Sequence, residues 1–314
     1  MAVGFIGLGN VGAKLAGTLV RNGVDLRVHD LDPAAVARLV AAGATEAEGP
    51  VALMASCETV ITCLPSPAAC AAVVEAMLPE VKPGKTWIEM STTDAGEVRR
   101  LGDAVVARGG RAAECPVSGG CHRAATGNIS IFAGGPRETF DAVLPLLTLM
   151  GRRVLHTGDL GTASTLKVMT NYLATANLLT LCEALTTMAA QGLDLGVTYE
   201  AIRISSGTSF VHETESQMIL NGCRTIDFTL GLVRKDVGLF QALADARGVP
   251  LEIGPLLLDI VDDGIARFGA GAQSDRLIER LEAATGLDVT APGFPAEMVD
   301  DEPEARGYEV VPAR

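Results

Sequence analysis

Residues 4–12 read GFIGLGNVG, and this stretch decides the fold. The apolar run at 3–6 is typical of a short buried strand, and a helical pattern through Leu15 and Leu19 follows directly. The order strand, G-x-G-x-x-G, helix is the context in which this glycine spacing binds a dinucleotide. The first glycine permits a tight turn, the second admits the pyrophosphate, and the third lets helix and strand pack closely. The predicted cofactor loop comprises Gly7, Leu8, Gly9, Asn10, Val11 and Gly12.

A second predicted strand, at 26–30, ends in Asp30, eighteen residues after Gly12. A carboxylate at this point accepts hydrogen bonds from the ribose hydroxyls of NAD and repels the 2′-phosphate of NADP. The next residue, Leu31, offers no positive charge to that phosphate. The sequence therefore predicts NAD as the cofactor and disfavours NADP. Glycines that serve only to end a strand are the alternative, and the register of strand, helix, second strand and acid disfavours it.

Up to about residue 155, short apolar strands alternate with helical patterns, which favours a doubly wound parallel sheet. From Gly161 onward strand signals vanish, and a helical run at 166–191 is long enough to link two domains. We predict a Rossmann-type domain at 1–160, an all-helical domain for substrate binding and oligomerisation at 161–292, and a C-terminal tail at 293–314. The tail is expected to lie on the surface or to cross to a neighbouring subunit. Further strands are expected at 59–63, 86–90, 111–114, 129–132 and 153–155, and further helices near 95–108, 197–206, 210–221, 229–247, 251–267 and 274–285.

The composition narrows the classes of partner. The 314 residues carry a net charge of −13, which disfavours nucleic acids and anionic membranes. Seven cysteines without a C-x-x-C pair, and four histidines without a ligand pattern, indicate reduced thiols and no metal site. With no signal peptide and no run of ~18 uncharged apolar residues, we expect a cytoplasmic protein without a membrane partner. Helices that lack a strongly polar face predict a homodimer or homotetramer.

Lys167 and Asn171 stand four residues apart at the start of the long helical run, so they share one face of the helix. Leu166, Val168, Met169 and Leu173 are expected to bury the other faces. A partly dry environment lowers the pKa of a lysine toward neutrality. We therefore expect Lys167 to act as a general acid/base.

A second candidate site is the loop after the strand at 111–114, where Ser118 precedes Gly119 and Gly120. Backbone amides in such a loop can face an anion, and the Ser118 hydroxyl adds a donor. A turn that uses glycine only for its dihedral angles is the alternative. After the strand at 86–90, Ser91 and Thr92 are candidates for contact with the nicotinamide, the alternative being that Ser91 or Thr93 caps the next helix. By itself, Lys235-Asp236 reads as a surface charge pair.

With these motifs the chain resembles the β-hydroxyacid dehydrogenase family, which contains 3-hydroxyisobutyrate dehydrogenase and tartronate semialdehyde reductase. The resemblance extends to about residue 290 through GFIGLGNVG, CPVSGG with GNISIFAGG, GTASTLKVMTN and RKDVGL, in that order. It implies hydride transfer between NAD and a small 3-hydroxyacid or its semialdehyde. It implies that Lys167 is the catalytic lysine, that Asn171 orients the substrate, and that Ser118, Gly119 and Gly120 hold its carboxylate. It also implies cofactor contacts at Leu64, Pro65, Thr92 and Lys235.

Several positions depart from the family pattern. Glu114 and Glu89 stand where aspartate is common, and Ala163 replaces the second glycine before the lysine, all conservative changes. His122 and Arg123 follow the double glycine where small residues are customary. We expect them to receive a second anionic group of the substrate, such as a carboxylate or sulfonate, with a solvated loop as the alternative. Pocket residues for the substrate side chain are expected at Phe210, His212 and Phe228.

Rival functions remain open. An imine-reducing relative is disfavoured because lysine is retained at 167, and a sugar-acid decarboxylase would need a basic phosphate pocket and a larger helical domain. A non-catalytic dinucleotide-binding scaffold would have lost Lys167 and Asn171, and both are present.

Overall fold

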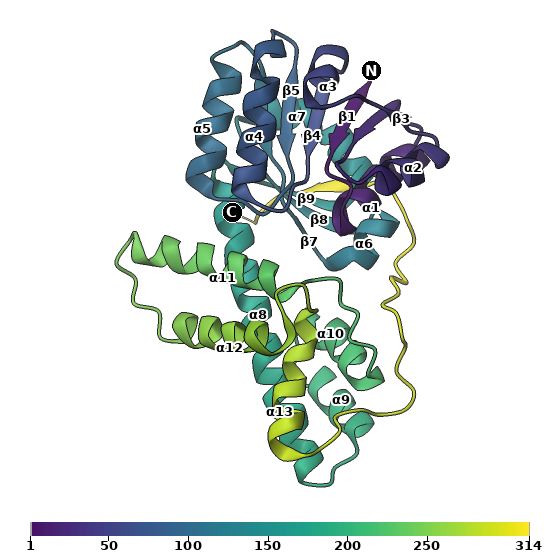
Figure 1. Ribbon diagram of the computed structural model, residues 1–314, viewed down its shortest axis with the longest axis vertical. Coiled ribbons are helices and arrows are strands. Elements are labelled where there is room, and N and C mark those ends of the chain that lie inside the picture. The colour runs from purple at the N-terminus through teal and green to yellow at the C-terminus, as the bar shows by residue number, and fades with distance from the viewer. Residues whose placement is uncertain (1, 314) are drawn as a thin grey trace. The chain divides into compact units, whose positions relative to one another are not determined.

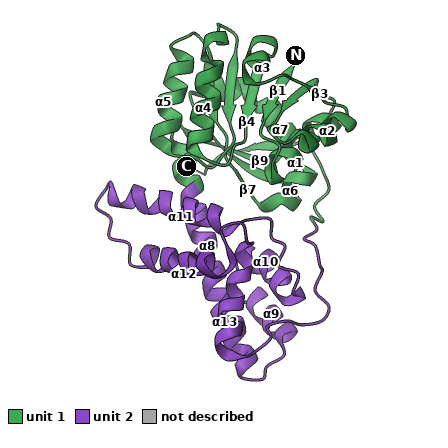
Figure 2. Cartoon of the chain, viewed as in Figure 1, with its two compact units in different colours: residues 1–167, 300–314 green, residues 168–299 purple. Residues whose placement is uncertain are grey.

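A computed structural model describes residues 2–313 (Figure 1). The chain divides into two compact units (Figure 2). Unit 1 comprises Met1–Lys167 and Asp300–Arg314, and unit 2 comprises Val168–Val299. The chain therefore passes between the units twice, and the last part of the predicted tail belongs to unit 1.

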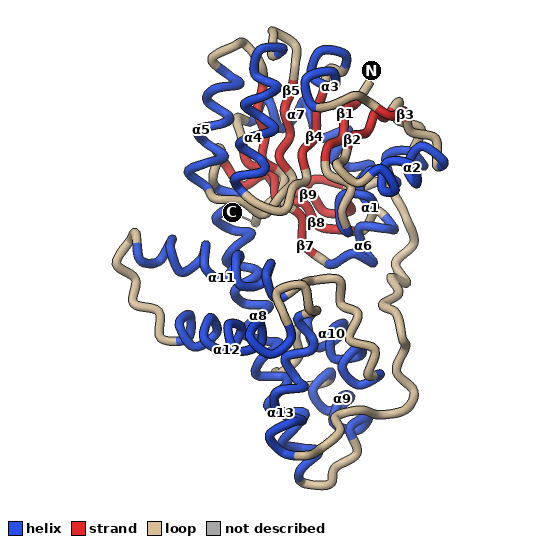
Figure 3. Tube along the Cα trace, viewed as in Figure 1, coloured by secondary structure: helices blue, strands red, loops and turns tan. Residues whose placement is uncertain are grey.

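Unit 1 is built on one sheet with the strand order β10-β9-β8-β6-β5-β4-β1-β2-β3, with β7 paired to β8 (Figure 3). All pairs are parallel except those of β8 with β6 and β7. The predicted Rossmann-type fold is confirmed, with three strands added, β8, β9 and β10, that run opposite to the rest. The strands are β1 (Val3–Ile6), β2 (Leu26–His29), β3 (Thr45–Glu46), β4 (Thr59–Thr62), β5 (Thr86–Glu89), β6 (Arg111–Glu114), β7 (Val117–Ser118), β8 (Ile129–Gly134), β9 (Gly151–Gly158) and β10 (Tyr308–Val310).

Helices cover both faces of this sheet because successive strand residues point to opposite sides. Phe5 packs in a core with Leu15 of α1 and Phe140 of α7. Its neighbour Ile6 packs in a second core with Val74 of α4. The helices of unit 1 are α1 (Asn10–Arg21), α2 (Pro33–Ala41), α3 (Pro50–Ser56), α4 (Pro67–Met77), α5 (Ala95–Val106), α6 (Gly120–Thr126) and α7 (Arg137–Met150), with a 3-10 turn at Leu78–Glu80.

Unit 2 is helical. Its core joins Leu185 of α8, Val237 of α11, Val261 of α12 and Ile278 of α13. The helices are α8 (Thr162–Ala190), which begins in unit 1, then α9 (Leu195–Arg203), α10 (Phe210–Asn221), α11 (Leu230–Asp245), α12 (Ile253–Phe268), the 3-10 turn η2 (Ser274–Leu277) and α13 (Ile278–Thr285).

Helix α8 is long and apolar enough to cross a membrane by length and composition alone, with a mean hydropathy of 1.3. The sequence criterion of ~18 uncharged apolar residues is stricter, and α8 does not meet it, because Lys167 and Glu183 leave only the 15 uncharged residues 168–182 between them. The same composition suits a long core helix, and Cys182 and Leu185 of α8 are buried in the core of unit 2.

Candidate functional site

The carboxyl ends of four neighbouring strands meet at one edge of the sheet. In the observed register Ile6 of β1 lies beside Thr62 of β4, Thr62 beside Glu89 of β5, and Glu89 beside Glu114 of β6. The strand order reverses between β1 and β4, where open α/β sheets bind their ligands. Most of the predicted site residues of unit 1 lie on the loops that leave this edge.

The glycine loop shows why each of its glycines is needed. Gly7 has a φ of +96°, and a Cβ there would lie 2.2 Å from the Cys63 carbonyl oxygen. A Cβ on Gly12 would lie 2.0 Å from the Gly7 carbonyl oxygen. At Gly9, by contrast, a Cβ would meet no atom within 4 Å, and no side chain caps α1 there. This open helix N-terminus suits the pyrophosphate of a dinucleotide.

Asp30 follows β2 and is hydrogen-bonded into the glycine loop. Its Oδ2 accepts from the backbone N–H of Leu8 at 2.5 Å, and its Oδ1 accepts from that of Asp32 at 2.8 Å. The carboxylate is only half-buried, so an oxygen can also reach a ribose hydroxyl. The chain's own residues at this end of the sheet therefore fit a bound dinucleotide.

The loops after β4 and β5 are joined by Ser91. Its Oγ accepts from the backbone N–H of Leu64 at 2.7 Å, while Pro65 and Thr92 lie beside this link in sequence. Helix α5 is capped by Asp94, which accepts from the N–H groups of Gly96 and Glu97. The capping alternative for Ser91 and Thr93 was therefore wrong, and Ser91 instead fixes the spacing of two predicted cofactor loops.

Glu89, which the sequence marked only as a departure, is a buried hydrogen-bond centre. Its carboxylate accepts from Thr62 Oγ1 at 2.5 Å, Cys70 Sγ at 2.7 Å and the Ser91 N–H at 2.7 Å. Burial raises the pKa of Glu89, and these hydrogen bonds partly oppose that rise. Glu89 therefore fixes the backbone of Ser91 at the start of the loop after β5.

In the predicted substrate loop, residues 118–120, the positive φ values of Gly119 (+129°) and Gly120 (+84°) explain the double glycine. Ser118 ends β7 opposite Ser130 of β8, and α6 begins at Gly120. These dihedrals fit a carboxylate cradle and a simple turn equally, so both interpretations stay open. His122 and Arg123 lie on α6, and burial, followed by the charge of Arg123, lowers the pKa of His122 against the opposing effect of Asp300. This lowered pKa favours the neutral ring of His122, so the permanent positive charge of this turn is that of Arg123.

Glu114 anchors the start of α8 at the carboxyl end of β6. Its fully buried carboxylate accepts from the N–H groups of Gly161 at 2.5 Å, Ala163 at 2.9 Å and Ser164 at 3.2 Å, and from Ser164 Oγ at 2.5 Å. Burial raises its pKa, with these donors acting in opposition. The catalytic candidate Lys167 follows Ser164 by three residues, so Glu114 fixes the turn of helix that carries it.

Lys167 itself is buried, with 8% of its surface exposed, as expected for a lysine in a partly dry environment. Val168 is buried as well. Leu173 is 50% exposed, so the expectation that it covers one face of α8 was wrong.

Asn171, one turn beyond Lys167 on α8, has a partner that the sequence did not reveal. Its Nδ2 donates to Asp236 Oδ2 at 2.5 Å, and Asp236 Oδ1 forms an ion pair with Lys235 Nζ at 3.1 Å. Asp236 is only 2% exposed, so the interpretation of Lys235-Asp236 as a surface pair was wrong. The sequence could have indicated this burial, because Asp236 lies on the same face of the helix as Val233 and Val237, which are both buried.

The residues expected to form the side-chain pocket are dispersed. His212 is buried, its Nε2 lies 2.9 Å from the Tyr199 carbonyl oxygen, and its ring packs 4.6 Å from that of Tyr199. His212 therefore belongs to the core of unit 2 rather than to a pocket. Phe228 packs against the same core, whereas Phe210 is 42% exposed.

The seven thiols are free, and burial raises the pKa of four of them, Cys57, Cys70, Cys115 and Cys182. Such thiols are poor nucleophiles. Over residues 2–313, no cluster of three or more His, Cys, Asp and Glu side chains is arranged to hold a metal ion.

Two family models match the chain in succession. Residues 2–158 match the NAD binding domain of 6-phosphogluconate dehydrogenase, and residues 161–281 match the NAD-binding domain of NADP-dependent 3-hydroxyisobutyrate dehydrogenase. The C-terminal residues beyond 281 lie outside both models.

Known proteins agree with these models. The chain is 30% identical over 297 residues to 2-(hydroxymethyl)glutarate dehydrogenase of Eubacterium barkeri, covering 92% of this chain and 97% of the relative. It is 32% identical over 268 residues to NAD-dependent L-serine dehydrogenase of Pseudomonas aeruginosa, covering 82% and 90%. The solved structure of Mycobacterium tuberculosis 3-hydroxyisobutyrate dehydrogenase with L-serine matches with a TM-score of 0.81 and 25% identity, covering 89% and 98%. The chain belongs to the β-hydroxyacid dehydrogenase family, and it is an oxidoreductase that acts on a CH–OH group with a nicotinamide dinucleotide.

Proposed function

We propose that this enzyme transfers a hydride between NAD and a small 3-hydroxyacid or its semialdehyde, with Lys167 as the general acid/base. The observation that carries the proposal is the anchorage of Lys167. Glu114 ties the first turn of α8 to the carboxyl end of β6, so a buried lysine follows at the sheet edge that also carries the open glycine loop. A fixed lysine beside a dinucleotide site is what proton transfer coupled to hydride transfer requires.

The chain's residues divide the work of oxidation among them. Amides of the loop Ser118–Gly120 hold the substrate carboxylate and so fix the carbinol carbon. The neutral Nζ of Lys167 takes the hydroxyl proton as the C–H bond gives up its hydride, and the C–O bond becomes a carbonyl. Nicotinamide, when bound, would supply the hydride acceptor for this oxidation and the hydride donor for the reverse reaction. Asn171, itself held by Asp236, orients the substrate hydroxyl toward Lys167, and Lys235 contacts the cofactor.

The preference for NAD rests on Asp30. Its carboxylate is held beside the glycine loop by the Leu8 N–H, and a negative charge there favours ribose hydroxyls over a 2′-phosphate. The next residue, Leu31, is almost fully exposed and carries no charge. One relative is named as an NAD-dependent enzyme, whereas a matching family model is named for an NADP-dependent one. The names therefore differ, and our choice of NAD is based on Asp30.

For the substrate, we favour a hydroxyacid that bears a second anionic group. Arg123 supplies a positive charge on the helix turn that follows the carboxylate loop, and neutral His122 supplies a ring nitrogen. The relative from Eubacterium barkeri is named for a hydroxyacid with two carboxylates, which agrees with this choice. We also propose that the protein is cytoplasmic. We propose a homodimer or homotetramer because unit 2 exposes the apolar side chains of Val197, Ile204 and Leu256.

Initial rates of NADH formation test the proposal. NAD and NADP are supplied in turn with 3-hydroxyisobutyrate, L-serine, 2-(hydroxymethyl)glutarate and a sulfonated 3-hydroxyacid. We expect turnover with NAD, a preference for the dianions, and loss of that preference in Arg123→Ala. An enzyme that binds NAD but oxidises none of these acids would contradict the proposed substrate class, and equal rates with NADP would contradict the role of Asp30.

A further inference from the structure

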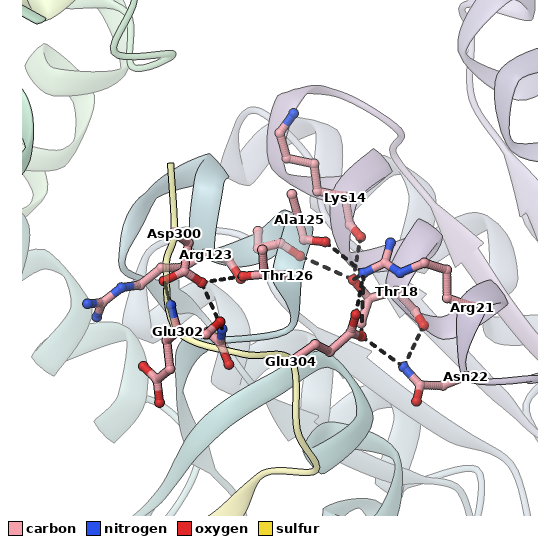
Figure 4. Close-up of polar contacts among 12 residues, drawn as sticks. Lys14, Thr18, Arg21, Asn22, Arg123, Ala125, Thr126, Asp300, Glu302 and Glu304 are labelled. Atoms are coloured by element: carbon pink, nitrogen blue, oxygen red, sulfur yellow. Dashed lines mark hydrogen bonds and ion pairs between the residues drawn. The ribbon is translucent and has the colours of Figure 1, made fainter. Parts of the chain in front are cut away.

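Residues 300–310, here called the C-terminal arm, return to unit 1 and lie along α1, α6 and β9. The arm lies outside both family models, the second of which ends at residue 281. Figure 4 shows Asp300 and Glu304 reaching polar groups of α6 and α1. The arm is therefore a part of unit 1 that the nucleotide-binding domain of the family does not itself supply.

Asp300 joins the arm to the end of α6. Its Oδ2 accepts from Thr126 Oγ1, in the last turn of α6, and from Asn128 Nδ2 at 2.8 Å. Asn128 is fully buried, and its Nδ2 donates a second hydrogen bond to the Glu302 carbonyl oxygen at 2.5 Å. Buried amide donors need acceptors, and here the arm supplies two of them to Asn128 Nδ2.

Helix α6 depends on support from outside itself. It has seven residues, well below the length at which a helix persists alone, and no side chain caps its start at Gly119. On one side α1 supports it, because Thr18 Oγ1 donates to the Ala124 carbonyl at 3.2 Å and Arg21 Nη2 donates to the Ala125 carbonyl at 2.6 Å. On the other side, the arm provides the contacts of Asp300.

The arm is itself fixed without help from α6. Strand β10 pairs with Arg153–Leu155 of β9, and Glu309 forms an ion pair with Arg137 at 2.6 Å. At Gly307 the backbones approach so closely that a Cβ would lie 1.9 Å from the Gly151 carbonyl oxygen. The arm can therefore serve as a fixed point against which α6 is held.

We propose that Asp300 is a positioning residue, which orients the substrate loop by holding α6 from its far end. The proposal rests on the function proposed for residues 118–123. Gly119 and Gly120 lead into α6, and Arg123 lies one turn before Thr126, so a shift of the helix end moves all three. The negative charge of Asp300 acts on Arg123 and His122 as well. The arm thus sets both the direction of the carboxylate loop and the electrostatic environment of the second anion site.

The test compares Asp300→Ala with Asp301→Ala, which removes the neighbouring, exposed aspartate. For Asp300→Ala we expect the KM of the hydroxyacid to rise about tenfold, as the loss of two hydrogen bonds suggests, with kcat and the KM of NAD within about twofold of wild type. Amide hydrogen exchange at 120–128 should accelerate, while exchange at 7–12 stays unchanged. Asp301→Ala should match wild type in every measurement.

Gly307→Ala provides an independent variant, because its added methyl displaces β10 without touching α6. It should reproduce the raised hydroxyacid KM and the faster exchange at 120–128. If Asp300→Ala does not fold, Asp300→Asn replaces it, and a smaller change in the same direction is expected. Unchanged exchange at 120–128 in folded Asp300 and Gly307 variants would overturn the proposal, and so would faster exchange with an unchanged hydroxyacid KM. A wild-type enzyme without activity would instead overturn the proposed function, while the exchange data would still show whether the arm holds α6.

Discussion

Two loops of unit 1 use glycine in the same way but are held in different ways. The glycine loop 7–12 leads into a helix of 12 residues, and its tight contacts are made with Cys63 and within the loop itself. The proposed substrate loop 118–120 leads into a helix of seven residues, whose end is bonded to an aspartate 174 residues further along the chain. The first loop is held by residues no further along the chain than Cys63, and the second by a segment near its C-terminal end.

This difference corresponds to the two ligands, because the cofactor is common to many enzymes whereas the hydroxyacid is specific to each. Any dinucleotide presents the same pyrophosphate, so a loop held by the neighbouring strands β2 and β4 suffices for it. Hydroxyacids differ from one another, and a loop whose position depends on a distant segment can be retuned without disturbing the cofactor site. Changes in the arm are therefore expected to alter substrate binding and to leave NAD binding intact.

The largest effect is expected at Lys167, which belongs to neither loop. Lys167→Ala should lower kcat by at least ~100-fold, because the proton acceptor is lost, while the Kd of NAD stays within about twofold. Steady-state rates and calorimetric titration with NAD measure the two quantities. Lys82→Ala, at an exposed lysine of unit 1, is the matched control and should behave as wild type. Comparable turnover in Lys167→Ala would remove the lysine from the mechanism.

A smaller effect, on NAD affinity, is expected when a methyl group is added to the glycine loop at Gly9. A methyl at Gly9 meets no protein atom, so Gly9→Ala should melt at the wild-type temperature and yet bind NAD roughly tenfold more weakly, because the methyl occupies the space of the pyrophosphate. Gly12→Ala is the counterpart, since its methyl would lie 2.0 Å from the Gly7 carbonyl oxygen and should lower stability first. Unchanged NAD affinity in Gly9→Ala would place the pyrophosphate elsewhere.

The sequence predicts best those features that depend on near neighbours. The run at 3–6 and the glycines after it define β1, the turn and α1, and the structure confirms all three. The strands β3, β7 and β10 have two or three residues each, and each is a strand only because a partner lies beside it. No apolar run marks them, so they could not be predicted.

The hydrogen bonds that position the predicted site residues were not predicted either, because their partners are distant in the sequence. Glu89 and Glu114 are visible as acids at strand ends, but the donors that surround Glu114 come from residues 161–164. Asn171 and Asp236 are 65 residues apart and meet only after two helices have packed. The proposed roles of Lys167, Asn171 and the loop Ser118–Gly120 stay predictions, since they rest on chemistry that a substrate would reveal.

The smallest effect, and the most direct probe of the two loops, is the response of α6 to acid. Burial alone would raise the pKa of Asp300, but hydrogen bonds from Thr126 and Asn128 outweigh it and hold this pKa below the ordinary value. A carboxylate with a lowered pKa stabilises the fold above its unfolded pKa, near 4, and that stabilisation is lost as the pH falls through the folded value.

Amide exchange at 120–128, corrected for its intrinsic pH dependence, should therefore accelerate a few-fold below about pH 4, while the interior of α1 at 15–19 stays protected. Asp300→Asn has no proton to gain, so its exchange at 120–128 should be faster at neutral pH and should lack this acid step. If the step persists in Asp300→Asn, another carboxylate releases α6, and Glu309, whose pKa Arg137 lowers, is the next to replace. If α1 and α6 lose protection together in the wild type, the two loops are not held independently, and the contrast between a local cofactor site and a remotely supported substrate site fails.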